Sequence, residues 1–147
     1  MISHLPMMRN AATLLLALSL SWIACAFPAH AQQFPDPRRF ESAIVEFEQQ
    51  DRINPPPEGA IVLTGSSSIA RWNDQARAAL APLTVVPRGF GGSVMHDVLH
   101  YLDRVALKYK PRAILIYEGD NDTGGDPPIP REAILDDLRK IIARTHE

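Results

Sequence analysis

The sequence predicts an α/β protein, a three-layer α/β/α sandwich built on a parallel sheet. Three short aliphatic runs, at residues 60–64, 83–87 and 113–117, alternate with stretches whose apolar residues recur at helical spacing. Runs that are aliphatic throughout and end at turn residues are typical of buried parallel strands. Because strands that alternate with helices form βαβ units, we expect helices on both sides of one sheet.

The first 31 residues are predicted to be an export signal, so residues 32–147 would form a single domain. Arg9 precedes an apolar stretch over residues 11–27, and Ala29-His30-Ala31 provides a cleavage site with small residues on both sides. The apolar stretch is too short to cross a bilayer comfortably. We therefore expect an exported product, periplasmic or secreted, with no stable membrane span after the signal is removed.

Composition indicates a small-molecule partner. The chain has 147 residues, with 15 Lys and Arg against 17 Asp and Glu and a net charge of −2. No basic surface for nucleic acid is predicted from that balance. The single cysteine, Cys25, lies in the predicted signal, so the domain would have no disulfide and no cysteine ligand for a metal.

The helices are predicted from their caps and apolar spacing. Asp36-Pro37 begins a helix that the prolines at 55–57 end, and a second helix is expected around 75–80. A third helix carries one apolar stripe and stops before Pro111, and Pro130 begins the last one. The stripe consists of Val94, Val98, Leu99, Leu102, Val105 and Ala106.

Three polar loops follow the carboxyl ends of the predicted strands, which is where open α/β sheets bind ligands. The loops lie at residues 65–68, 89–93 and 119–122. Taken singly, the loops are explained by helix capping, by a turn and by a solvated loop, respectively. Together they offer what acyl transfer needs: a hydroxyl, a glycine N–H and an amide that can donate to an oxyanion. We therefore predict Ser67 as the nucleophile, and as oxyanion donors its own N–H, the Gly92 N–H and the Asn121 side chain.

These motifs resemble those of the SGNH (GDSL-like) hydrolases, which include esterases, lipases, thioesterases and sugar deacetylases. The stretch "IVLTGSSSIARW" is similar to the first block of the family, with Ser66 in place of the usual aspartate, "RGFGGS" to the second and "GDND" to the third. The resemblance runs from about Phe40 to Ile142. It implies a flavodoxin-like sandwich, an ester or acyl substrate, no cofactor, and the roles already given to Ser67, Gly92 and Asn121.

The general base is missing from the pattern. The family carries it in an Asp-x-x-His block near the C-terminus, and no such block follows the third loop. The spacing occurs once, at Asp97 and His100, but a helical wheel places His96, His100 and Asp103 opposite the apolar stripe, where we expect solvent. His146 has no acidic residue three positions before it. We therefore expect a chain truncated at its C-terminus, with an uncovered strand or sheet face.

Three alternatives remain open. His96 and His100, four residues apart on a helix, could share a zinc ion if a third ligand were present. Asp120 and Asp122 follow a strand, as in the Asp-x-Asp loop of magnesium-dependent aspartyl-phosphate phosphatases. A non-catalytic domain that binds an acyl or sugar ligand, or an inactive remnant, is the third. No catalytic role is assigned to three residues that border the loops, Trp72, Arg88 and Glu118.

Overall fold

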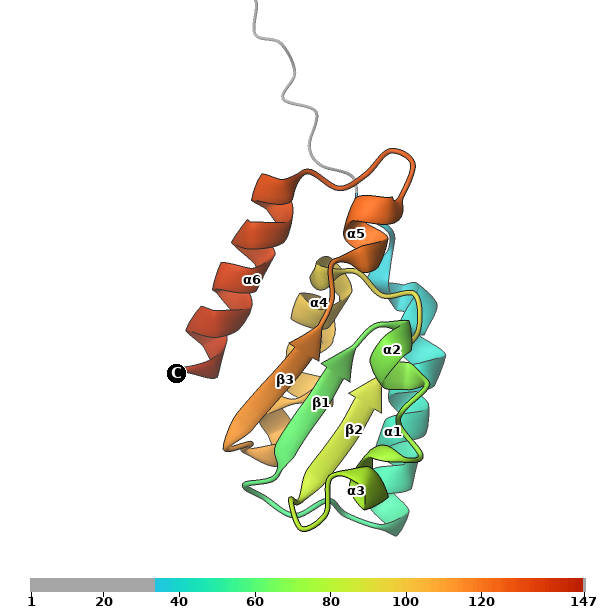
Figure 1. The fold of residues 1–147 in the computed structure, drawn as a ribbon, viewed down its shortest axis with the longest axis vertical. Helices are drawn as coiled ribbons and strands as arrows, with labels where there is room; N and C mark the ends of the chain where they lie inside the picture. Colours follow the sequence, from blue (N-terminus) through green and yellow to red (C-terminus); the bar gives the residue numbers. More distant parts are fainter. Residues whose placement is uncertain (1–33, 147) are drawn as a thin grey trace, which may run out of the picture. The chain divides into compact units, whose positions relative to one another are not determined.

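Three parallel strands form one sheet in the order β2-β1-β3 (Figure 1). The computed structural model describes residues 34–146, so the predicted export signal lies outside the described residues. Along β1, Ile61 lies between Val85 and Ala113, and the register continues to Gly65. The strands are β1 (Ile61–Gly65), β2 (Val85–Gly89) and β3 (Ala113–Tyr117).

Helices lie on both faces of this sheet, which confirms the predicted three-layer α/β/α sandwich (Figure 1). One face is covered by α1 (Glu41–Ile53), α4 (Met95–Val105) and α6 (Arg131–Thr145), with the 3-10 turns η1 (Pro37–Phe40) and η2 (Leu107–Tyr109). The other face carries the short helices α2 (Ser67–Ala70) and α3 (Ala76–Ala79). One further turn of helix, α5 (Asp120–Gly124), follows β3.

The two faces have separate apolar cores, because successive side chains of a strand point to opposite sides of the sheet. Val62 and Val86 face the larger core, which the apolar stripe of α4 fills together with residues of α1 and α6. Leu63 and Val85 face the smaller core, where Ile69 comes from α2. No helix within residues 34–146 is long and apolar enough to cross a membrane.

β2 begins and ends two residues later than the sequence predicted. Gly89, which we expected in the loop, and Arg88, which we expected to border it, are the last two residues of the strand and lie beside Gly65 and Thr64 of β1. Arg88 is buried on the face of the sheet that α1 covers. There it forms an ion pair with Asp51, and its Nε donates to the Tyr109 hydroxyl at 2.8 Å. These contacts give the arginine a packing role.

The prediction that β3 is buried on both faces is wrong. Its residues alternate between exposed and half-buried, and Leu115 and Tyr117 are 47% and 45% exposed. The reason is its place at the edge of the sheet: α2 and α3 lie over β1 and β2 and leave the same face of β3 uncovered.

Gly65 ends β1 at a position that admits no side chain. Its φ is +126°, and a Cβ there would lie 2.2 Å from the carbonyl oxygen of Tyr117. The Ser66 N–H donates to that same oxygen at 3.0 Å. β1 and β3 can therefore come this close, and carry the first and third loops side by side, only with glycine at this position.

We expect Gly65→Ala to lower the free energy of unfolding by more than about 2 kcal/mol, because backbone atoms of two strands would have to separate. Chemical denaturation measures the change. Gly124→Ala is the matched control, since a Cβ at Gly124 meets no atom within 4 Å, and it should shift the value by less than about 0.5 kcal/mol. Equal effects of the two substitutions would contradict the prediction.

Candidate active site

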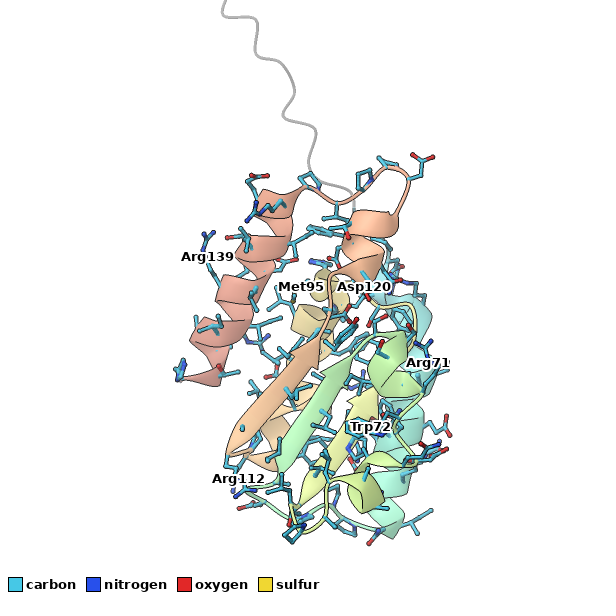
Figure 2. The ribbon with its side chains drawn as sticks, viewed as in Figure 1. Arg71, Trp72, Met95, Arg112, Asp120 and Arg139 are labelled. Atoms are coloured by element: carbon cyan, nitrogen blue, oxygen red, sulfur yellow. The ribbon has the colours of Figure 1, made fainter. Side chains whose placement is uncertain are left out.

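The three predicted loops meet at the carboxyl end of the sheet. Ser67 begins α2 directly after β1, Gly92 lies between β2 and α4, and Asn121 lies in α5 after β3. Met95 and Asp120, which begin α4 and α5, are at this same end (Figure 2). Parallel strands place their carboxyl ends on one side, so the fold itself brings the loops together.

Ser66 is the residue through which the loops are joined. Its buried hydroxyl accepts hydrogen bonds from Asn121 Nδ2 at 2.5 Å and from the Gly92 N–H at 3.3 Å. From the sequence, Ser66 is expected only to replace the usual aspartate of the motif. Its place in the motif was the available signal, since aspartate and serine both present a side-chain oxygen that can accept hydrogen bonds.

Ser67 lies beside this junction with its hydroxyl unengaged. The residue is half-buried, and no hydrogen bond of its side chain occurs within residues 34–146. The glycine loop runs close to it, because a Cβ on Gly91 would lie 3.7 Å from Ser67 Cα and 3.9 Å from Ser67 Cβ.

The side chain of Asn121 has both of its N–H groups in use. Nδ2 donates to Ser66 Oγ and, at 2.8 Å, to the carbonyl oxygen of Ser93. An amide nitrogen has two hydrogens, so none is left over for a further acceptor. A substrate oxygen that binds to Asn121 and Gly92 must therefore compete with Ser66 Oγ for their hydrogens.

Two buried carboxylates position the backbone around the loops. Asp122 accepts from the Met95 N–H at 3.0 and 3.2 Å and so joins α5 to the start of α4. Asp97 accepts from the Val94 N–H at 2.9 Å and from Arg39 at 2.5 Å. Burial raises the pKa of both carboxyl groups. Asp97 is thus held by the Val94 N–H and by Arg39, and within residues 34–146 it forms no hydrogen bond with His100.

The expectation that all three polar residues of α4 face solvent is wrong for His96. His100 and Asp103 are exposed, whereas His96 is half-buried. Its Nδ1 lies 3.0 Å from Asp137 of α6, and its ring stacks on Phe34 with centroids 4.0 Å apart. The helical wheel correctly predicts which side of α4 faces away from the sheet. Part of that side is covered by α6, which packs against it at His96.

The metal and phosphatase alternatives gain no support from the geometry. Within residues 34–146, no group of three or more His, Cys, Asp or Glu side chains is arranged to hold a metal ion. Asp120 is exposed and accepts a hydrogen bond from the Tyr117 hydroxyl, while Asp122 turns inward to the Met95 N–H. The carboxylates of Asp120 and Asp122 therefore bind different partners.

Glu118, to which the sequence pattern assigns no catalytic role, also lies at the site. It accepts a hydrogen bond from the Ser93 hydroxyl, and its Oε2 has no hydrogen-bond partner within the described residues. Burial, with Asp122 and Asp97 nearby, raises the pKa of this carboxyl to about 8. With that pKa, the carboxyl of Glu118 is mostly protonated at pH 7, which lessens the cost of burying it.

Comparisons with known proteins identify the fold. No family model matches the chain, and no curated protein does. Among solved structures, the chain is similar to that of "a putative platelet activating factor from Streptococcus pneumonia", with 25% sequence identity and a TM-score of 0.57. The match covers 71% of this chain and 47% of the other, so this chain spans about half the length of that one. The likeness supports the α/β sandwich.

We expect Ser66→Ala to lower the free energy of unfolding by about 1–3 kcal/mol, because two donors lose their acceptor. Chemical denaturation measures this. Ser68→Ala is the matched control, since Ser68 adjoins the site but its hydroxyl accepts a hydrogen bond from neither Gly92 nor Asn121. This substitution should change the free energy of unfolding little. The junction would be of no consequence to stability if the two variants unfolded alike.

The raised pKa of Glu118 predicts a loss of stability with rising pH. An ordinary glutamate ionises near 4.5, so between about 4.5 and 8 the folded state holds a proton that the unfolded state releases. The free energy of unfolding then falls through this window, by at most about 1.4 kcal/mol per pH unit. Glu118→Gln, which cannot ionise, should flatten that slope, as measured by denaturation from pH 5 to 9.

The control for this pH experiment is Glu46→Gln, at an exposed position of α1. That variant should keep the slope of the wild-type chain. If Glu118→Gln also kept it, the carboxyl of Glu118 would be ionised in the folded state across the whole window.

Proposed function

We propose that this chain is a serine hydrolase of the SGNH type that cleaves an ester or a related acyl bond through an acyl-enzyme on Ser67. The observation that carries the proposal is the junction of Ser66 with Gly92 and Asn121, at 3.3 and 2.5 Å, directly beside Ser67. Backbone and amide donors gathered next to a serine at a strand-to-helix turn are what an oxyanion needs. The similar solved structure is in keeping with a hydrolase-type fold.

In this proposal, the Ser67 oxygen attacks the acyl carbon and its proton passes to a base. The carbonyl oxygen becomes an oxyanion, stabilised by the N–H groups of Ser67 and Gly92 and by Asn121. Collapse of this intermediate breaks the bond to the leaving group, which takes up the proton, and water then releases the acyl group by the same route. Each donor of this kind contributes roughly a hundredfold or more to the rate.

Ser66 has a defined part in this sequence of steps. Its Oγ occupies the hydrogens of Gly92 and Asn121 before substrate arrives. A rotation of the Ser66 side chain would release both donors at once. The oxyanion then takes the place of the neutral Ser66 hydroxyl as the acceptor. Hydrogen bonds to a charged acceptor are roughly twice as strong as those to a neutral one.

The alternative is a non-catalytic domain that binds an acylated ligand in the same place. The observation that favours it is the unengaged Ser67 hydroxyl: within residues 34–146, no histidine or carboxylate accepts its proton. Glu118 is held by Ser93, and His96 by Asp137. A serine without a base is a weak nucleophile, so ligand binding would remain while turnover would not.

Export is part of the proposal as well. The predicted signal at residues 1–31 would place the domain in the periplasm or outside the cell. The net charge of −2 and the polar site favour a small acylated molecule over nucleic acid as the partner. No cofactor is needed for the chemistry proposed.

A fluorophosphonate probe separates the two functions, because it reacts only with an activated serine. We expect labelling of the wild-type chain on Ser67, detected by mass spectrometry, and none in Ser67→Ala. Ser68→Ala is the control, since this neighbour is half-buried like Ser67 and its loss should leave labelling unchanged. A folded wild-type chain that takes up no label would reject the hydrolase and favour the binding domain.

A further inference from the structure

The backbone of Gly89, the last residue of β2, is held by a single side chain from another segment of the chain. Asn73 Nδ2 donates to the Gly89 carbonyl oxygen, and Asn73 Oδ1 accepts from the Gly89 N–H, both at 2.9 Å. An amide side chain offers a donor and an acceptor in one plane, as a backbone peptide group does. Asn73 therefore bonds the end of β2 in the way that a neighbouring strand would.

Asn73 belongs to the segment that carries the predicted nucleophile. α2 begins at Ser67 and lies beside the carboxyl end of β2 (Figure 1). Turns continue directly from this helix: the Arg71 N–H donates to the Ser67 carbonyl oxygen at 2.9 Å, and the Asn73 N–H donates to that of Ala70 at 3.3 Å. The bonds between Asn73 and β2 therefore tie the segment of Ser67 to that strand.

The missing side chain of Gly89 lets the two segments lie directly on each other. A Cβ at Gly89 would lie 2.3 Å from the backbone nitrogen of Ala70 and 2.5 Å from the carbonyl carbon of Ile69. The backbone of α2 thus rests on the backbone of β2 at the same residue that Asn73 bonds. Protection of an edge strand, the usual reason for covering its backbone groups, needs no such contact.

Three residues lead from Gly89 to the predicted oxyanion donor at Gly92. The Phe90 ring is buried in the larger core, and the Phe90 N–H donates to the Gly65 carbonyl oxygen at 2.9 Å. The Gly92 N–H then reaches Ser66 Oγ at 3.3 Å. A loop this short follows the strand from which it starts, so the position of Gly89 bears directly on that of the Gly92 N–H.

We propose that Asn73 is a positioning residue of the candidate active site, which sets the place of the Gly92 N–H relative to Ser67. Its side chain joins the segment of the nucleophile to the loop of the oxyanion donor and does not itself touch the substrate. The effect on the reaction rests on the proposed function, whereas the effect on the loop is measurable without turnover. Misplacing reacting groups by about 1 Å costs up to about a hundredfold in rate, so a small movement of this loop matters.

Two measurements on the full chain test this role: the rate of labelling by a fluorophosphonate probe, and the exchange of the Phe90 and Gly92 amide hydrogens followed by NMR. We expect Asn73→Ala to slow labelling by about tenfold or more and to speed both exchange rates by about the same factor. Asn73→Asp should behave like Asn73→Ala, because an ionised carboxylate has no hydrogen to donate to the Gly89 carbonyl oxygen. An asparagine that only filled space would be replaced by aspartate without loss.

Two control variants separate positioning from a general loss of stability. Gln75→Ala removes an exposed amide side chain that makes no capping hydrogen bond to α3, and it should leave labelling and exchange unchanged. Val85→Ala removes packing from the smaller core at the other end of β2. It should lower the midpoint of chemical denaturation without slowing the labelling of the folded chain.

Labelling of Asn73→Ala or Asn73→Asp at the wild-type rate would overturn the proposal, as would unchanged exchange of Phe90 and Gly92. So would labelling of Val85→Ala that is slowed as much as that of Asn73→Ala, because stability alone would then explain the effect. A wild-type chain that takes up no label would reject the hydrolase instead. In that case the exchange rates alone would decide whether Asn73 holds the loop.

Discussion

The close approach of β1 to β3 at Gly65 is the constraint on which the rest of the molecule depends. β1 is the central strand, and β2 and β3 pair with it on either side. Each loop of the candidate site follows the carboxyl end of one of these three strands. The missing side chain at Gly65 lets the Ser66 N–H reach the Tyr117 carbonyl oxygen. That bond fixes Ser66 against the start of the third loop, and from there its hydroxyl reaches both Gly92 and Asn121.

Around this junction, buried polar groups are linked by a chain of hydrogen bonds. Asn121 bonds Ser66 and Ser93, Ser93 bonds Glu118, and Asp122 bonds the start of α4. A polar group buried without a partner costs more than a hydrogen bond returns, so these contacts hold the loops in one arrangement. Within residues 34–146, the hydroxyl of Ser67 takes no part in these hydrogen bonds, which keeps it available to a ligand.

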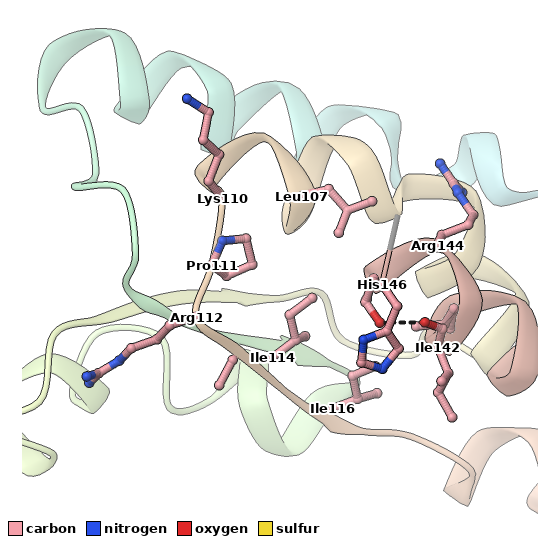
Figure 3. Close-up of a pocket in the computed structure, with 12 residues that line it drawn as sticks. Leu107, Lys110, Pro111, Arg112, Ile114, Ile116, Ile142, Arg144 and His146 are labelled. Carbon is pink, nitrogen blue, oxygen red and sulfur yellow. Dashed lines mark hydrogen bonds between the residues drawn. The ribbon is translucent and has the colours of Figure 1, made fainter.

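The two outer strands of the sheet, β2 and β3, differ in their surroundings. Asn73 and Arg88 satisfy the backbone of β2 and end the sheet there. Within residues 34–146, no strand lies beside β3 on its outer side, and its side chains line a groove there (Figure 3).

The sequence by itself determined the fold class, because aliphatic runs alternating with amphipathic stretches leave few other ways to bury apolar surface. It also placed Ser67, Gly92 and Asn121 on loops that the structure brings to one end of the sheet, since that follows from parallel strand order alone. Only the tertiary structure decided that Ser66 joins the loops, that α6 covers His96, and that β3 stays exposed. Each of these depends on which elements pack side by side, and local spacing carries no information about neighbours distant in the chain.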